Sequence, residues 1–125
     1  MFDDVPDATP AFEELWQHFA RPEHWRLVDE IAHLWRSLAG QNLMLGIASN
    51  FDARLETISQ ALLPELDPRY LFISSRIGWR KPQPAFFASI EAQLQLRPEQ
   101  ILLVGDDPEN DLRGAQSAGW HALLV

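Results

Sequence analysis

The sequence predicts an α/β fold built on a parallel sheet, and two observations support this. From residue 41 onward, short apolar runs alternate with segments of helical periodicity, in the order strand, helix, strand, helix, strand, helix, strand. Such alternation favours right-handed crossovers between parallel strands. The chain has 125 residues, 46% of them hydrophobic and 22% charged, which is an ordinary balance for one globular domain with a buried core.

The first forty residues predict helices rather than strands. Apolar residues recur at helical spacing between Phe12 and Phe19, and again in a second stripe that ends at Leu38. Pro22 suits the first turn of the second helix, and Gly40 suits its end. We therefore expect a helical segment to precede the alternating region.

The alternating region contains seven expected elements. In chain order they are a strand at 43–48, a helix at 53–63, a strand at 70–74, a helix that begins at Pro84, a strand at 101–104, a helix at 108–118 and a strand at 121–125. Asp52 can cap the first of these helices, and Gly119 suits the left-handed turn after the last. The strands at 43–48 and 101–104 are continuous apolar runs, which predicts that they are buried.

Composition restricts the partners and the compartment. Ten Lys and Arg residues against eighteen Asp and Glu give a formal net charge of −8, which argues against nucleic acid or an anionic membrane as a partner. Cysteine is absent, so disulfides and thiolate metal sites are excluded. The start of the chain is acidic, unlike a secretory signal, and no apolar run approaches the ~18 residues of a membrane span. These features predict a cytoplasmic protein.

Polar side chains follow the predicted strands where each strand ends. Ser49 and Asn50 follow the first strand, Lys81 lies between the second strand and the next helix, and Asp106 and Asp107 follow the third strand. Ligands of open parallel sheets bind beyond the carboxyl ends of the strands. We therefore expect these side chains to share one edge of the sheet and to form a binding site.

The types of these residues suit a phosphate group. Lys81 is the only lysine in the chain, and a compact ammonium makes point contacts with phosphate oxygens. A solvated surface lysine would explain Lys81 equally well if it is considered alone. The hydroxyl of Ser49 and the amide of Asn50 can bind a phosphate oxygen, although both residues are also common in turns.

The carboxylates after the third strand suggest a cation. Asp106, Asp107, Glu109 and Asp111 fall within six consecutive positions. Like charges repel unless they are protonated or bridged, and hard oxygen ligands suit Mg²⁺. Helix capping is an alternative, with Asp107 as the N-cap and the later acids in the first turn. That alternative leaves Asp106 unexplained, and the spacing does not match an EF-hand loop.

Three ordered segments resemble motifs of the haloacid dehalogenase-like (HAD) hydrolase superfamily. LGIASN is similar to its second motif, GWRKPQPAFF to its third and GDDPENDLRGAQSAG to its fourth, the GDxxxxD form. The resemblance implies that Ser49 and Lys81 are catalytic and bind the transferred phosphoryl group, with Asn50 beside them. It implies that Asp106 and Asp111, with Asp107 between them, bind Mg²⁺ as the cofactor.

The resemblance also implies a domain organisation. Residues 41–125 resemble the carboxyl-terminal part of the hydrolase core, and residues 1–40 resemble the end of a helical cap. Family members begin with a strand that ends in DxDGT, whose first Asp is the nucleophile, and no such strand precedes Ser49. We therefore expect a Rossmann-like parallel sheet that lacks its first, central strand. Such a truncated chain would be marginally stable alone, and its unpaired strand edges would favour self-association.

The function implied is a Mg²⁺-dependent phosphatase that acts on a small phosphorylated compound through an aspartyl-phosphate. Without the nucleophile, the chain alone is expected to show no turnover. The alternative is a non-catalytic module that binds Mg²⁺ and phosphate, or a protein. Dehalogenase chemistry uses the same kind of aspartate, but the GDxxxxD acids favour phosphoryl transfer. A response-regulator receiver does not fit, because Lys81 precedes Asp106 here and receivers have the reverse order.

Overall fold

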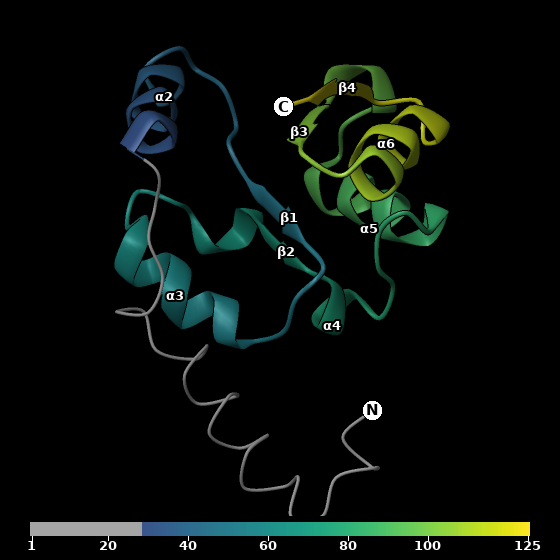
Figure 1. Ribbon diagram of the computed structural model, residues 1–125, viewed down its shortest axis with the longest axis horizontal. Helices are drawn as coiled ribbons and strands as arrows, with labels where there is room; N and C mark the ends of the chain where they lie inside the picture. The colour runs from purple at the N-terminus through teal and green to yellow at the C-terminus, as the bar shows by residue number, and fades with distance from the viewer. Residues whose placement is uncertain (1–28) are drawn as a thin grey trace, which may run out of the picture. The chain divides into compact units, whose positions relative to one another are not determined.

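The computed structural model describes residues 29–125 (Figure 1). The described residues form two compact units, one comprising residues 29–47 and 53–71 and the other residues 48–52 and 72–125. The helix expected between Phe12 and Phe19 lies outside the described residues. The domain boundary expected at residue 40 stays a prediction.

The first unit is helical in its described part. It contains α2 (Asp29–Ala39), α3 (Arg54–Leu62) and a short 3₁₀ helix, η3 (Pro68–Tyr70). The end of α2 confirms the helix predicted before Gly40. Helix α3 confirms the helix predicted at 53–63, and its assigned N-cap is Ala53, one residue after Asp52. Buried apolar residues of this unit are Ile58, Leu63 and Leu66.

Asp67 caps η3 and gives this unit an acid-sensitive contact. Its carboxylate accepts the backbone N–H of Arg69 at 2.9 Å and the guanidinium Nη2 of the same residue at 2.7 Å. The Arg69 side chain, then its backbone N–H, lower the pKa of Asp67 below the ordinary value of 3.8. A carboxyl whose pKa is lower in the folded state stabilises the fold above its unfolded pKa. That stabilisation is lost as the pH falls through the lowered value.

We expect Asp67→Asn to flatten the acid limb of the stability curve. The wild-type free energy of unfolding, measured by urea titration, should fall more steeply than that of the variant as the pH drops below 3.8. The amide keeps an oxygen that can accept the Arg69 N–H but has no proton to gain. Parallel acid limbs for the two proteins would show that Asp67 carries no folding-linked titration.

The two strands β1 (Ile47–Ser49) and β2 (Leu71–Ile73) pair in a two-stranded sheet. Both are shorter than predicted, and residues 43–46 before β1 are not in a strand. Leu43 and Met44 are 53% and 52% exposed, so the prediction that the run at 43–48 is buried was wrong at its start. No strand of the described residues pairs with this stretch, which leaves its apolar side chains uncovered.

The second unit carries most of the α/β alternation. Its further elements are α4 (Ser74–Ile77), α5 (Pro84–Leu94), the 3₁₀ helix η4 (Pro98–Gln100), β3 (Leu102–Gly105), the π-helical segment η5 (Pro108–Arg113), α6 (Gly114–Ser117) and β4 (His121–Leu124). Helix α5 begins at Pro84 as predicted, and Gly119 has the expected left-handed conformation, with φ of 85°. The predicted helix at 108–118 is instead a π-helical segment that continues into α6.

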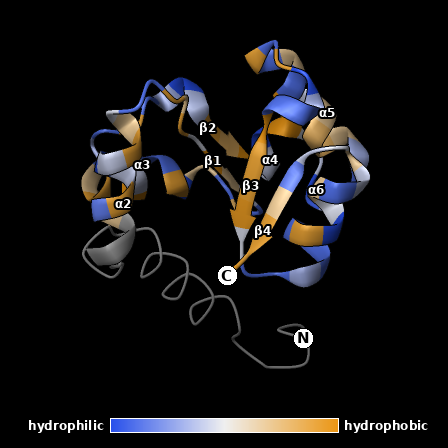
Figure 2. Ribbon diagram, turned by 90° about the horizontal axis from the view of Figure 1, so that it is seen from above, coloured by the Kyte–Doolittle hydropathy of each residue, from blue (hydrophilic) through white to orange (hydrophobic). Residues whose placement is uncertain are grey.

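Strands β3 and β4 are parallel, which confirms the predicted sheet type. In their register Leu102 lies opposite His121 and Val104 lies opposite Leu123. Leu102, Val104 and Leu123 are 58%, 52% and 54% exposed, so this face of the sheet is uncovered. The orange colour of β3 in Figure 2 marks its apolar character. The predicted burial of the third strand was therefore wrong for one face. A parallel strand is buried only where helices cover both faces of its sheet.

Aromatic side chains form the core of the second unit. Phe86 and Phe87 of α5 are fully buried, and their rings meet edge to face with centroids 5.5 Å apart. The Phe87 ring also meets Trp120 edge to face at 5.0 Å. The indole N–H of Trp120 donates to Glu91 Oε2 at 3.0 Å, which satisfies the polar end of a buried ring. This core fixes α5 against the segment that precedes β4.

No helix of residues 29–125 has the length and apolar character needed to cross a membrane.

Candidate active site

Lys81 and Asp111 form a buried ion pair. The Lys81 Nζ donates to Asp111 Oδ1 at 2.5 Å, and the two residues are 9% and 7% exposed. The pair joins the loop before α5 to the segment η5, which are 30 residues apart in sequence. Burial excludes the alternative that Lys81 is a solvated surface lysine. Buried charges are expensive unless they are paired, so this contact holds both side chains in place.

Asn50 binds the backbone of Lys81 in both directions. Its Oδ1 accepts the Lys81 N–H at 2.8 Å, and its Nδ2 donates to the Lys81 carbonyl at 3.0 Å. Asn50 directly follows β1, so these bonds tie the end of that strand to the lysine. Ser49 is the last residue of β1 and is half-buried. The sequence predicted phosphate contacts for Asn50, whereas its amide is bonded to Lys81 in the structure.

The second oxygen of Asp111 and a neighbouring glycine fix its position. Asp111 Oδ2 accepts the backbone N–H of Asp107 at 3.2 Å. Gly105, the last residue of β3, lies against the Asp111 side chain, because a Cβ placed on Gly105 would come within 2.7 Å of Asp111 Cβ. Real Cβ atoms essentially never approach so closely. The sequence pattern did not predict this requirement for space at Gly105.

Asp107 confirms the capping alternative for one of the clustered acids. Its Oδ1 accepts the backbone N–H groups of Glu109 and Asn110, each at 2.9 Å, at the start of η5. The N–H of Asn110, then that of Glu109, lower the pKa of the Asp107 carboxyl. Asp106, in contrast, is exposed and takes no part in this cap. Capping therefore explains Asp107 but leaves Asp106 available for another role.

The carboxylates of this region are of the ligand type that Mg²⁺ prefers, but they are few in number. Within residues 29–125, no three His, Asp or Glu side chains are grouped so that they could hold a metal ion. Mg²⁺ in phosphoryl-transfer sites is commonly held by one or two carboxylates, with waters and phosphate oxygens completing the shell. Asp106 and Asp111 are two such carboxylates, although Asp111 is already paired with Lys81. Metal binding stays a prediction.

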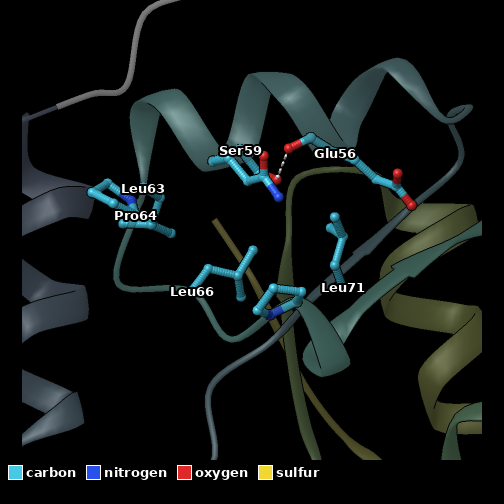
Figure 3. A pocket seen from close by; sticks show the side chains of 8 residues that line it. Glu56, Ser59, Leu63, Pro64, Leu66 and Leu71 are labelled. Carbon is cyan, nitrogen blue, oxygen red and sulfur yellow. Dashed lines mark hydrogen bonds between the residues drawn. The ribbon is translucent and has the colours of Figure 1, made fainter.

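A cavity of about 350 Å³ lies elsewhere, in the first unit (Figure 3). It is lined by Glu56, Ser59, Gln60, Leu63, Pro64, Leu66, Pro68 and Leu71. The Ser59 Oγ donates to the backbone carbonyl of Glu56 at 3.1 Å, so that hydroxyl is engaged within α3. None of the residues predicted for the site lines this cavity. Its lining is mainly apolar and contains no basic side chain.

A second side-chain tie lies beside the first and was not predicted. Ser74 Oγ accepts the backbone N–H of Phe51 at 3.0 Å and donates to the Phe51 carbonyl at 3.1 Å. Ser74 begins α4, a helix of four residues that is too short to produce a periodic pattern. Asn50 and Phe51 are thus consecutive residues, each held through its own pair of hydrogen bonds to a segment that follows β2.

Comparison with known proteins finds haloacid dehalogenase-like proteins that are similar to this chain in sequence, and solved structures that are similar to it in fold. The HAD-hydrolase-like family matches residues 78–125. The haloacid dehalogenase-like hydrolase domain-containing protein 3 of Bos taurus is 30% identical over 122 residues, which cover 98% of this chain and 49% of that protein. The human protein of the same name is also 30% identical over 122 residues, again covering 98% of this chain and 49% of that protein.

Two solved structures share the fold. A HAD phosphatase from Thermococcus onnurineus matches with a TM-score of 0.77 and 22% identity, over 91% of this chain and 52% of that one. A putative HAD hydrolase from Bacillus subtilis, described as bound to magnesium, matches with a TM-score of 0.67 and 26% identity, over 80% and 45%. The chain spans about half the length of the curated relatives it matches.

Proposed function

Because the chain belongs to the haloacid dehalogenase-like hydrolase superfamily, we propose that it forms the carboxyl-terminal part of a phosphatase core. In this proposal the substrate is a small phosphorylated compound. The observation that carries the proposal is the buried pair between Lys81 and Asp111, two residues from different motifs. In such an arrangement, an anionic group binds the ammonium at the end of the strand and a cation binds the carboxylates of the neighbouring loop.

Each residue of the site has a proposed role. The Ser49 hydroxyl and the Lys81 ammonium bind oxygens of the phosphoryl group, where the ammonium offsets negative charge. Asp106 and Asp111 bind Mg²⁺, which when present neutralises charge on the same phosphoryl oxygens. Asp107 holds the start of η5 through its cap, and in this way keeps the acidic loop in shape. For these roles the Lys81–Asp111 ion pair must separate, so that the ammonium binds the phosphoryl group and the carboxylate binds Mg²⁺.

Turnover requires a group that these 125 residues do not contain in a recognisable form. A carboxylate would attack phosphorus, form a new P–O bond and expel the alcohol, and water would then release phosphate from the aspartyl-phosphate. No apolar strand followed by DxD precedes Ser49, and Asp3, Asp4 and Asp7 lack the accompanying Thr or Gly. We propose that the chain alone binds phosphate but does not hydrolyse phosphate esters.

Two measurements on the purified chain test this proposal. Titration calorimetry with inorganic phosphate in the presence of Mg²⁺ should give saturable binding that Asp106→Asn weakens. Asp67→Asn is the matched control, because it removes an equal charge far from the site residues in sequence and should leave binding unchanged. Hydrolysis of p-nitrophenyl phosphate should not exceed the background rate, and turnover abolished by EDTA would contradict the proposed lack of a nucleophile.

The alternative, a non-catalytic binding module, makes the same binding prediction for this chain. It differs for a longer protein in which these residues follow a strand carrying DxD, where the phosphatase proposal expects turnover. The pairing of Lys81 with Asp111 fits this alternative as well, since a site that satisfies its own charges is stable without a substrate. Phosphate binding without turnover in such a longer protein would favour the binding module.

A further inference from the structure

We propose that Asn50 is a positioning residue that sets the Lys81 ammonium in the site, and this rests on the proposed function of Lys81. The side-chain amide of Asn50 is engaged with the Lys81 backbone, as acceptor from its N–H at 2.8 Å and as donor to its carbonyl at 3.0 Å. An amide with both ends bonded to one backbone unit fixes the location and the direction of that unit. Asn50 therefore acts through Lys81 and not by contact with phosphate.

Lys81 needs such a tie because the rest of its loop is exposed. Gly78, Trp79 and Arg80 before it and Pro82 and Gln83 after it are all exposed, whereas Lys81 is buried. The loop's own bonds are local, with the Gln83 N–H donating to the Arg80 carbonyl at 2.8 Å. The lysine side chain is a flexible four-carbon stem. Its ammonium can be held in one place only if the backbone is fixed at one end and the charge at the other.

Two separate segments provide these two anchors. Asn50, after β1, holds the backbone of Lys81, and Asp111, in η5, holds its ammonium. Of the two side-chain contacts described above, only the ion pair with Asp111 would hold Lys81 once Asn50 is removed. The lysine would then leave the site more often, and a displacement of about 1 Å at a reacting group is already enough to cost a large factor in function.

The chain offers a matched control for this role. Ser74 makes two side-chain hydrogen bonds to the backbone of Phe51, at 3.0 and 3.1 Å, just as Asn50 makes two to Lys81. Both ties join the end of β1 to a segment after β2, and both are half-buried. Ser74→Ala therefore removes a comparable structural contact without touching the lysine. If Asn50 had a purely structural role, Asn50→Ala and Ser74→Ala would affect Lys81 to the same extent.

The reactivity of Lys81 toward an acetylating reagent measures its position directly. Because Lys81 is the only lysine, trypsin cleavage after Arg80 and Arg113 isolates it in the peptide 81–113, since Pro98 blocks cleavage after Arg97, and mass spectrometry then reads its acetylation separately from the amino terminus. In the folded full chain, Asn50→Ala should raise the acetylation rate about tenfold, the order expected when two neutral hydrogen bonds are lost. Ser74→Ala should leave the rate near that of the wild type.

Outcomes for a poorly folded variant are also decisive. If circular dichroism shows that Asn50→Ala is unfolded, Asn50→Asp replaces it, since the acid keeps the acceptor for the Lys81 N–H and loses the donor. The rate for Asn50→Asp should lie between those of the wild type and of a chain unfolded in urea. Equal rates for the wild type, the Asn50 variant and Ser74→Ala would overturn the positioning role.

A second arm separates this inference from the proposed function. Inorganic phosphate with Mg²⁺ should protect Lys81 from acetylation in the wild-type chain, and more weakly in the Asn50 variant. If phosphate gives no protection to the wild type while the Asn50 variant still reacts faster, Asn50 positions Lys81 but the proposed phosphate site is wrong. If phosphate protects both proteins equally, the site stands and the role of Asn50 in it fails.

Discussion

Gly105→Ala is expected to destabilise the protein severely by displacing Asp111. A Cβ on Gly105 would lie within 2.7 Å of Asp111 Cβ and closer still to the Asp111 carboxylate. Because Asp111 Cβ is fixed to the backbone of η5, rotation of the carboxylate cannot relieve the clash. Moving the backbone separates Asp111 from Lys81, and breaking a buried ion pair costs about 3–5 kcal/mol. That is a large share of the ~5–15 kcal/mol that stabilises a typical domain.

Gly40→Ala is the control for this substitution. The nearest atom to a Cβ on Gly40 is the Ser37 carbonyl oxygen at 3.6 Å, an ordinary contact, so the free energy of unfolding should change by about 0.5 kcal/mol or less. Urea unfolding followed by tryptophan fluorescence measures both variants. A loss for Gly105→Ala no larger than that for Gly40→Ala would show that the Asp111 side chain does not occupy the place assigned to it.

Lys81→Met should also cost a large part of the stability, through the charge that it leaves behind. Met has a similar length and apolar stem but no ammonium, so the Asp111 carboxylate stays buried without its partner. The two side chains are 11% and 10% exposed, and removing one partner of such a pair costs about 3–5 kcal/mol. The double variant Lys81→Met with Asp111→Asn should recover most of this loss, because the neutral amide needs no counter-charge.

Arg113→Met provides the matched comparison. Arg113 pairs with Glu109 at 3.1 Å on the same segment, but these side chains are 76% and 62% exposed. Loss of a surface pair is worth about 0–1 kcal/mol. Lys81→Met should therefore be several times more costly than Arg113→Met. Equal costs, or no recovery in the double variant, would mean that the Lys81–Asp111 contact is not a buried pair in solution.

Much of the fold could be predicted because proline and glycine mark its boundaries. Pro84 begins α5, and Gly119 turns the chain before β4, where its φ of 85° is one that glycine adopts without strain. The parallel pairing of β3 and β4 followed from the alternation of strands and helices. Strand lengths and burial were overestimated, because an apolar run such as 43–46 does not reveal whether another strand or helix lies against it.

The site was predictable in its members but not in their contacts. The rule that polar residues gather at strand ends identified Asn50 and Lys81, and the cluster of carboxylates included Asp111. The structure connects Lys81 to both Asn50 and Asp111. The rule did not predict that Asn50 bonds the Lys81 backbone or that Lys81 pairs with Asp111. Both contacts join residues about thirty positions apart. Their geometry depends on the loop before α5, whose exposed residues carry no periodic pattern.

The most direct test of a phosphoryl site at Lys81 is its own NMR signal. A chain grown with ¹³C,¹⁵N-lysine carries one labelled residue, so the side-chain resonances need no assignment. Titration with inorganic phosphate and Mg²⁺ at constant ionic strength should shift the Lys81 signals to a saturating limit, and Asp106→Asn should weaken that response. Lysine signals that do not respond to phosphate, in a chain whose dispersed spectrum shows that it is folded, would contradict the account.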